Sequence, residues 1–214
     1  MKKQIVEQIE KMSGRYSPYS IFSDWVEMMA LCIQNACSPH DDNWNYREKM
    51  YLDICKRYEK KEIITLGDMM GMLAITLEEQ GPHDILGEIY MESGCGSKYT
   101  GQFFTPWHLS LLTAEMADFP KDEVHTVNEP SCGGGGMILA VAAVMKKRNI
   151  DYQKNLKVVA QDLDWKAVYM TYVQISLLGI NGIVAQGNTL ADPDIGKYPP
   201  NRILRTPANM GVLL

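Results

Sequence analysis

Four successive glycines mark the part of this chain best suited to ligand chemistry, residues 128–136 (NEPSCGGGG). This segment follows a short β-type run and opens a helical stretch. Glycines allow positive φ angles and let the backbone approach a ligand without a Cβ in the way. A helix N-terminus adds N–H groups that have no intrahelical partner. The Glu129 carboxylate suits an ammonium or hydroxyl group, although the glycines alone also fit a loose turn.

Two further β-type runs end in polar residues. The second ends in Gln161-Asp162-Leu163-Asp164, and nucleotide-binding folds hold a ribose diol with an acid in this place. The alternative is that an aspartate caps the helix beginning at Trp165, so we expect Asp164 to cap and Asp162 to bind. The third run ends before Asn188, which would then lie at the same carboxyl edge of the sheet, where open α/β folds bind ligands.

The secondary structure that the sequence predicts around these residues changes in type near Gly94. Residues 1 to about 92 have helical periodicity, and the Ser/Gly-rich stretch at 93–96 is the best boundary. Beyond it, short β-type runs alternate with helices. The expected strands are 124–128, 156–160 and 183–186, and the expected helices are 106–118, 137–147 and 165–178. This alternation predicts an α/β fold with parallel strands and right-handed crossovers. The predicted domains are 1–93, helical, and 94–214, α/β.

Composition excludes several classes of protein. The chain has 214 residues, of which 46% are hydrophobic and 22% charged, typical of a globular protein. It contains no apolar run of membrane-spanning length and begins without a signal peptide, so we expect a cytoplasmic protein with no membrane contact. The net charge of −5 argues against a freestanding DNA-binding domain. Five cysteines without zinc-type spacing and four scattered histidines predict free thiols and no metal.

The motifs together resemble those of the adenine-N6 DNA methylases, and most closely the modification subunit of type I restriction-modification systems. The resemblance covers residues 20 to 190. It rests on four segments in the family's order and spacing: 101–106 (GQFFTP), 129–136 (EPSCGGGG), 160–164 (AQDLD) and 187–190 (GNTL). A helical domain precedes the first motif in that subunit as well. The fold this implies is a partial Rossmann-like, S-adenosylmethionine-dependent methyltransferase domain with an incomplete sheet, after a helical N-terminal region.

The resemblance also implies a cofactor site. Phe104, Thr105 and Pro106 match the motif that lines the methionine end of the cofactor. Glu129 matches an aspartate that binds the methionine amino group, and Asp162 matches the acid that holds the ribose hydroxyls. The full expected cofactor-binding set is Phe104, Thr105, Pro106, Glu129, Pro130, Cys132, Gly133, Gly135, Asp162, Leu163, Asn188 and Thr189.

Two members of this set depart from the family pattern. Asn188 stands where the family usually has an aspartate that binds the adenine amino group, and an amide both accepts and donates. Glu129 is one methylene longer than the usual aspartate and keeps its charge. Cys132 lies in the glycine loop without a neighbouring base, so we do not expect a nucleophile there.

The segment after the third strand departs further from the family. The family carries Asn/Asp/Ser-Pro-Pro-Tyr/Phe at the end of its fourth strand, where the motif holds the flipped adenine. This chain has Tyr198-Pro199-Pro200-Asn201 and Thr206-Pro207-Ala208-Asn209, neither in the required order. After these the sequence reaches Leu214 without room for the family's remaining strands or a target-recognition domain. The catalytic residues are therefore unknown.

Three functions remain open. The resemblance implies adenine-specific DNA methylation in a restriction-modification system, with DNA bound alone or only with a partner subunit, and a homo- or hetero-oligomer. The alternative is a catalytically inactive, cofactor-binding regulatory or subunit module. General nucleotide binding through the glycine loop is less favoured, because no Gly-Lys-Ser/Thr follows the glycines.

Overall fold

The computed structural model describes residues 1–39, 41–95, 104–121 and 123–212. Its first part is helical, as predicted. The helices are α1 (Lys2–Met12), α2 (Pro18–Cys37), α3 (Trp44–Cys55), α4 (Lys60–Gln80) and α5 (Ile85–Glu92). Local sequence sets their ends. Ser17 caps α2 ahead of Pro18, and α4 stops at Gly81, which has a φ of 78°.

The second part alternates helices and strands. Its elements are α6 (Trp107–Glu115), β1 (His125–Glu129), α7 (Gly136–Lys147), α8 (Tyr152–Asn155), β2 (Leu156–Asp162), α9 (Trp165–Leu177), β3 (Asn181–Gln186), β4 (Ile203–Arg205) and three 3-10 turns, η1 (Ile195–Lys197), η2 (Pro200–Arg202) and η3 (Pro207–Met210). The protein is therefore mixed α/β, which confirms the predicted class at that level.

The sheet has the order β1-β2-β3-β4. β1, β2 and β3 are parallel, with Glu129 beside Ala160 and Asp162 beside Gln186, so their carboxyl ends meet at one edge. The expectation of parallel strands throughout is wrong for β4, which pairs antiparallel with β3. A parallel neighbour needs a crossover, usually a helix. The segment between β3 and β4 contains three prolines and forms only short 3-10 turns, so the chain simply reverses.

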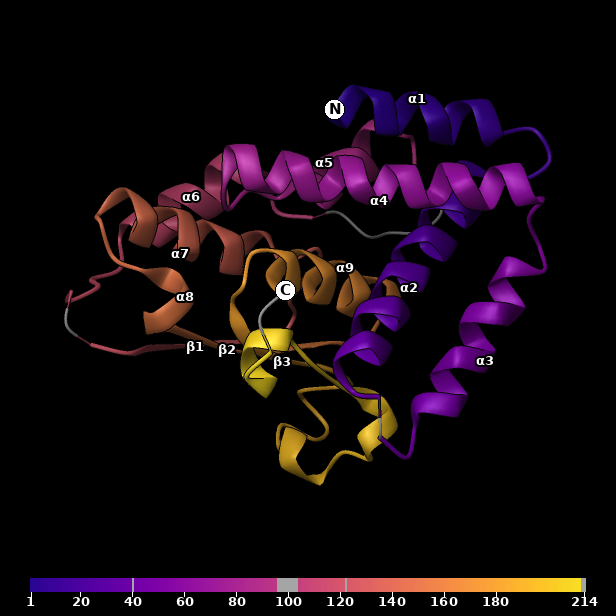
Figure 1. Cartoon of the computed structure of the whole chain (residues 1–214). Coiled ribbons are helices and arrows are strands. Elements are labelled where there is room, and N and C mark those ends of the chain that lie inside the picture. The colour runs from indigo at the N-terminus through magenta and orange to yellow at the C-terminus, as the bar shows by residue number, and fades with distance from the viewer. Residues whose placement is uncertain (40, 96–103, 122, 213–214) are drawn as a thin grey trace.

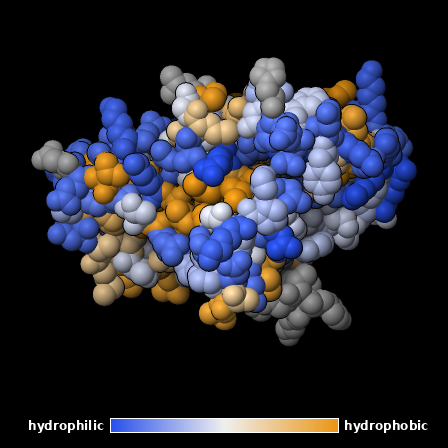
Figure 2. Space-filling model, turned by 90° about the horizontal axis from the view of Figure 1, so that it is seen from below, coloured by the Kyte–Doolittle hydropathy of each residue, from blue (hydrophilic) through white to orange (hydrophobic). Residues whose placement is uncertain are grey.

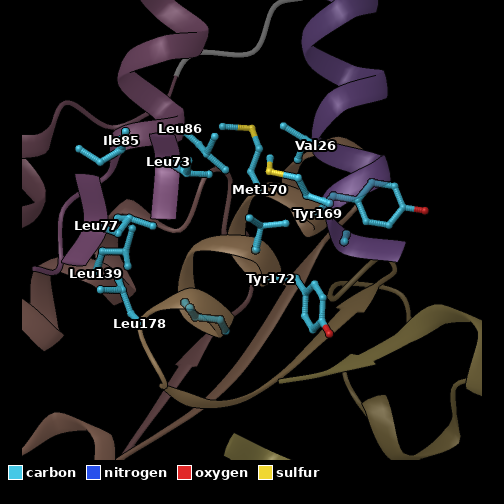
Figure 3. Close-up of a cluster of buried hydrophobic side chains, with 14 of the residues drawn as sticks. Val26, Leu73, Leu77, Ile85, Leu86, Leu139, Tyr169, Met170, Tyr172 and Leu178 are labelled. Atoms are coloured by element: carbon cyan, nitrogen blue, oxygen red, sulfur yellow. The ribbon is translucent and has the colours of Figure 1, made fainter. Parts of the chain in front are cut away.

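One apolar core runs through both parts of the chain. Buried residues from α1, α2, α4 and α5 belong to the same cluster as residues from α7, α9 and the sheet. Figure 3 shows Val26, Leu73 and Leu86 around Met170 on α9. Helix α9 therefore packs on the sheet with one side and on the helical region with another. The division into domains 1–93 and 94–214 stays a prediction.

The two faces of the sheet are covered differently. Helices α7 and α9 lie on one side, and the C-terminal segment lies on the other (Figure 1). Seen from that second side, apolar residues gather near the middle of the surface, with hydrophilic ones around them (Figure 2). In the described part of the chain, no helix combines the length and apolar character needed to cross a membrane.

Candidate cofactor site

The glycine loop joins β1 to α7 in a conformation that requires glycine. Gly133 and Gly135 have φ angles of 52° and 94°, in the left-handed region. A Cβ on Gly133 would lie 3.0 Å from the Phe104 ring, and one on Gly135 would lie 3.1 Å from Thr171 Oγ1. The loop is thus a closely packed structure that presents bare backbone at the start of α7.

Backbone hydrogen bonds fix this loop to the end of β2. Cys132 N donates to Gln161 O at 2.8 Å, and Gly133 N donates to Asp162 Oδ2 at 2.9 Å. The other carboxylate oxygen of Asp162 accepts from Asp164 N at 3.0 Å. Asp164 in turn caps α9, as predicted, because its side chain accepts from the backbone two residues further on. Asp162 therefore shapes the glycine loop as well as facing it.

The loop after β3 joins the same assembly. Gly187 N donates to Asp162 O at 2.9 Å, and Thr189 Oγ1 donates to Pro130 O at 2.8 Å. Asn188 is exposed, and its Oδ1 accepts from the backbone of its own turn, from Leu190 N at 3.1 Å. Three loops that are far apart in sequence are thus linked at the carboxyl edge of the sheet.

The segment before α6 completes the site on the α5 side. Phe104 packs against Tyr90, with ring centroids 5.1 Å apart, and together with Thr105 it borders a small hollow over Cys132 and Gly133. Pro106 borders an adjoining hollow between α5 and α6. The start of this motif, residues 101–103, lies outside the described residues. Leu163 is 67% exposed, at the outer end of β2.

A buried support behind the loop was not expected from the sequence. Asp84, 4% exposed, caps α5 by accepting from Gly87 N at 2.9 Å, and it also accepts from Gln174 Nε2 at 2.9 Å. Gln174 Nε2 donates to Gly134 O at 2.8 Å as well. The cap could have been predicted, because Asp84 directly precedes a helical run just after Gly81-Pro82. Its contact with a residue ninety positions away could not.

Two carboxylates dominate the electrostatics of the site. Burial raises the pKa of Glu129, the backbone N–H of Ser131 lowers it, and the nearby Asp162 charge raises it again. Neither Glu129 nor Asp162 forms an ion pair with any residue that the structure describes. The loop therefore holds negative charge that a cationic ligand would neutralise.

Cys132 is unsuited to nucleophilic chemistry, as expected. Its side chain is 5% exposed, and burial raises the pKa of the thiol to about 12. The thiol is therefore protonated near neutral pH, and its small side chain fills space under the loop.

Two polar residues after β3, Tyr198 and Asn209, have structural roles. Tyr198 is buried over Gly187, where its hydroxyl accepts from Gln161 Nε2 and donates to Asp192 O. Asn209 Nδ2 donates to Asn181 Oδ1 at 2.8 Å, at the opposite edge of the sheet from the glycine loop. Neither side chain is placed to hold a target base beside the loop.

The glycine loop, Glu129 and Asp162 all lie within a single segment of the chain that matches a known protein family. The family model described as N-6 DNA Methylase matches residues 82–206, more than half of the chain. This chain belongs to the N-6 DNA methylase family. The match to the family begins just before Asp84 and includes every expected cofactor residue from Phe104 to Thr189.

One curated relative of this chain is the Type I restriction enzyme MpnII methylase subunit of Mycoplasma pneumoniae (strain ATCC 29342 / M129 / Subtype 1). It is 35% identical to this chain over an alignment of 97 residues, which covers 42% of this chain and 17% of the relative. The chain thus spans less than two thirds of that relative's length. The similarity confirms the predicted likeness to the methylase subunit of type I restriction enzymes.

Proposed function

We propose that this chain binds S-adenosylmethionine across the carboxyl edge of β1, β2 and β3. The observation that carries the proposal is the pair of carboxylates, Glu129 and Asp162, which stand without a cationic partner among the described residues beside bare glycine backbone. The cofactor supplies an ammonium group and a ribose diol, which match the two acids, and a carboxylate, which matches the backbone N–H groups of the loop. The α/β part is then a Rossmann-like cofactor domain, 94–214, after the helical domain 1–93.

Each residue has a distinct part in this proposal. Glu129 holds the ammonium group, and Asp162 accepts from the ribose hydroxyls with the lone pairs that its backbone hydrogen bonds leave free. Phe104 and Thr105 line the methionine end. Asn188 faces the adenine, and its amide nitrogen is the natural contact because its oxygen already accepts from Leu190 N. The sides of the proposed cofactor pocket are formed by Pro130, Cys132, Leu163 and Thr189.

The role that follows from the family is adenine-N6 methylation of DNA in a restriction-modification system. The net charge of −5 and the structural use of Tyr198 and Asn209 favour a module that carries the cofactor and relies on a partner subunit for DNA.

Binding is tested by calorimetry with S-adenosylmethionine and with S-adenosylhomocysteine. We expect both to bind at one site, and we expect Gly133→Val to abolish binding because a side chain there meets Phe104. Ile75→Ala, an exposed change on α4 away from the site, is the control. If the wild type gives neither binding heat nor a thermal shift at millimolar cofactor, the proposed site is wrong.

Methyl transfer by the 214-residue chain alone is expected to be absent or very slow. The adenine amine is a weak nucleophile, so an enzyme must orient it toward the methyl group and stack the flipped base. We therefore expect no incorporation from labelled cofactor into mixed-sequence DNA, although the cofactor binds. Robust methylation of adenine that is abolished by Asn201→Ala would show that a rearranged motif is active.

Cofactor affinity should fall in acid because Glu129 must be ionised to hold an ammonium group. Since burial raises the pKa of Glu129, the loss begins at a higher pH than an exposed glutamate would give. Below that pKa the dissociation constant should rise about tenfold per pH unit, as one-proton linkage requires. Calorimetry between pH 4.5 and pH 7, with Glu129→Gln as the reference, checks this. An equal pH dependence in the variant would contradict it.

A further inference from the structure

A second cleft lies outside the glycine loop, where the helical region meets the sheet. It has a volume of about 300 Å³ and lies between α2, α3, the start of α9, the last residue of β3 (Gln186) and residues 200–204. Small-molecule sites in proteins occupy such junctions and have volumes from roughly this size upward. None of the glycine-loop residues lines it. Residues 200–204, at the end of the proline-rich segment, line one wall of this cleft.

Flat aromatic side chains form part of its lining. Trp165 and Tyr169, one turn apart on α9, are stacked with ring centroids 5.2 Å apart and an interplanar angle of 27°. Tyr46 on α3 also lines the cleft and is 54% exposed. Tyr169 is 6% exposed and its ring is covered by Trp165, so Trp165 and Tyr46 are the rings left to stack on a flat ligand.

A buried arginine in the lining has an unused donor. Arg47 is 8% exposed, its Nε donates to Asn35 Oδ1 at 2.7 Å, and its Nη1 donates to Asp41 Oδ2 at 3.1 Å. Its Nη2 is buried and has no acceptor among the described residues. A buried N–H without a partner is costly, so a ligand acceptor at this point would be favoured.

The rim of the cleft adds charge. Arg202 is exposed there and forms no ion pair within the described part of the chain, so its guanidinium is available to an anion. Glu27, half-buried in the wall, offers an acceptor for a ring amino group. A flat ring with an acceptor, an amino group and a nearby anion is the chemistry of a nucleotide.

We propose that this cleft binds the nucleobase of a nucleotide, with the ring against Trp165 and Tyr46, a base acceptor near Arg47 and the phosphate at Arg202. The site is separate from the proposed S-adenosylmethionine site and does not depend on it. The nucleotide is either free or part of a single DNA strand, and the two sources share this chemistry.

In the test, the full chain is titrated with guanosine, adenosine, cytidine and uridine 5′-monophosphates. Binding is monitored by tryptophan fluorescence and by calorimetry. We expect quenching of fluorescence on binding. Tyr46→Ala and Arg202→Ala should each weaken binding about tenfold, typical of losing one stacking partner or one phosphate contact. Trp165→Phe should keep the calorimetric affinity within a few-fold while removing the quenching. Ile64→Ala, an exposed change on α4, is the matched control.

Two further experiments distinguish binding in this cleft from binding at the glycine loop. Saturating S-adenosylhomocysteine and the variant Glu129→Gln, whose side chain accepts a hydrogen bond only from Ser131 N among the described residues, should leave nucleotide affinity unchanged. A short single-stranded oligonucleotide that binds with the same dependence on Tyr46 and Arg202 identifies the ligand as a base in a strand, whereas binding of mononucleotides alone identifies a free nucleotide. The proposal is overturned if no nucleotide or oligonucleotide binds at millimolar concentration, or if binding is indifferent to Tyr46→Ala and Arg202→Ala.

Discussion

Asp84→Ala should lower the free energy of unfolding by about 2–4 kcal/mol, because it removes a helix cap and leaves buried donors unpaired. The carboxylate accepts from Gly87 N and from Gln174 Nε2, and the same Gln174 nitrogen holds Gly134 O in the glycine loop. Chemical denaturation followed by circular dichroism measures the loss. We also expect weaker cofactor binding, since the loop loses its support from behind.

Two control variants distinguish the loss of the α5 helix cap from the loss of a carboxylate charge. Asp68→Ala removes an exposed carboxylate from α4 and should change the free energy of unfolding by less than about 0.5 kcal/mol. Asp84→Asn keeps an acceptor for Gly87 N, so it should cost less than Asp84→Ala. Equal stability of Asp84→Ala and the wild type would show that the buried contacts contribute nothing.

Asp162→Ala should weaken S-adenosylmethionine binding by about 1–3 kcal/mol, the cost typical of leaving hydrogen-bonded groups unpaired. Two effects add together. The proposed ribose contact is lost, and so are the acceptors of Gly133 N and Asp164 N that hold the loop. Calorimetry on wild type and variant measures the difference.

Ligand fragments separate these two effects of Asp162. If the ribose contact dominates, binding of adenosine weakens while binding of methionine is unchanged; if loop support dominates, both weaken. Asp164→Ala, which removes the cap of α9 and leaves the loop contacts in place, is the matched control and should bind normally. Unaltered affinity in Asp162→Ala would remove Asp162 from the cofactor site.

Most of the α/β part could be predicted because its signals are local. Short apolar runs placed β1, β2 and β3 within a few residues of their observed bounds, and parallel pairing followed from the helices between them. The direction of β4 was missed. Ile203 and Leu204 indicate a strand, but the direction depends on whether the preceding chain forms a crossover, and the prolines before it prevent a helix.

The sequence by itself determined the glycine loop, the acids in which β1 and β2 end, and the edge at which they meet, because glycine conformation and parallel pairing are set by residue type and order. The tertiary structure alone decided which distant residues complete the site. It brought Gln174 and Asp84 to the back of the loop, buried Tyr198 over Gly187, and placed Asn209 at the far edge. These contacts depend on how α5, α9 and the C-terminal segment pack, and packing joins side chains that no local pattern relates.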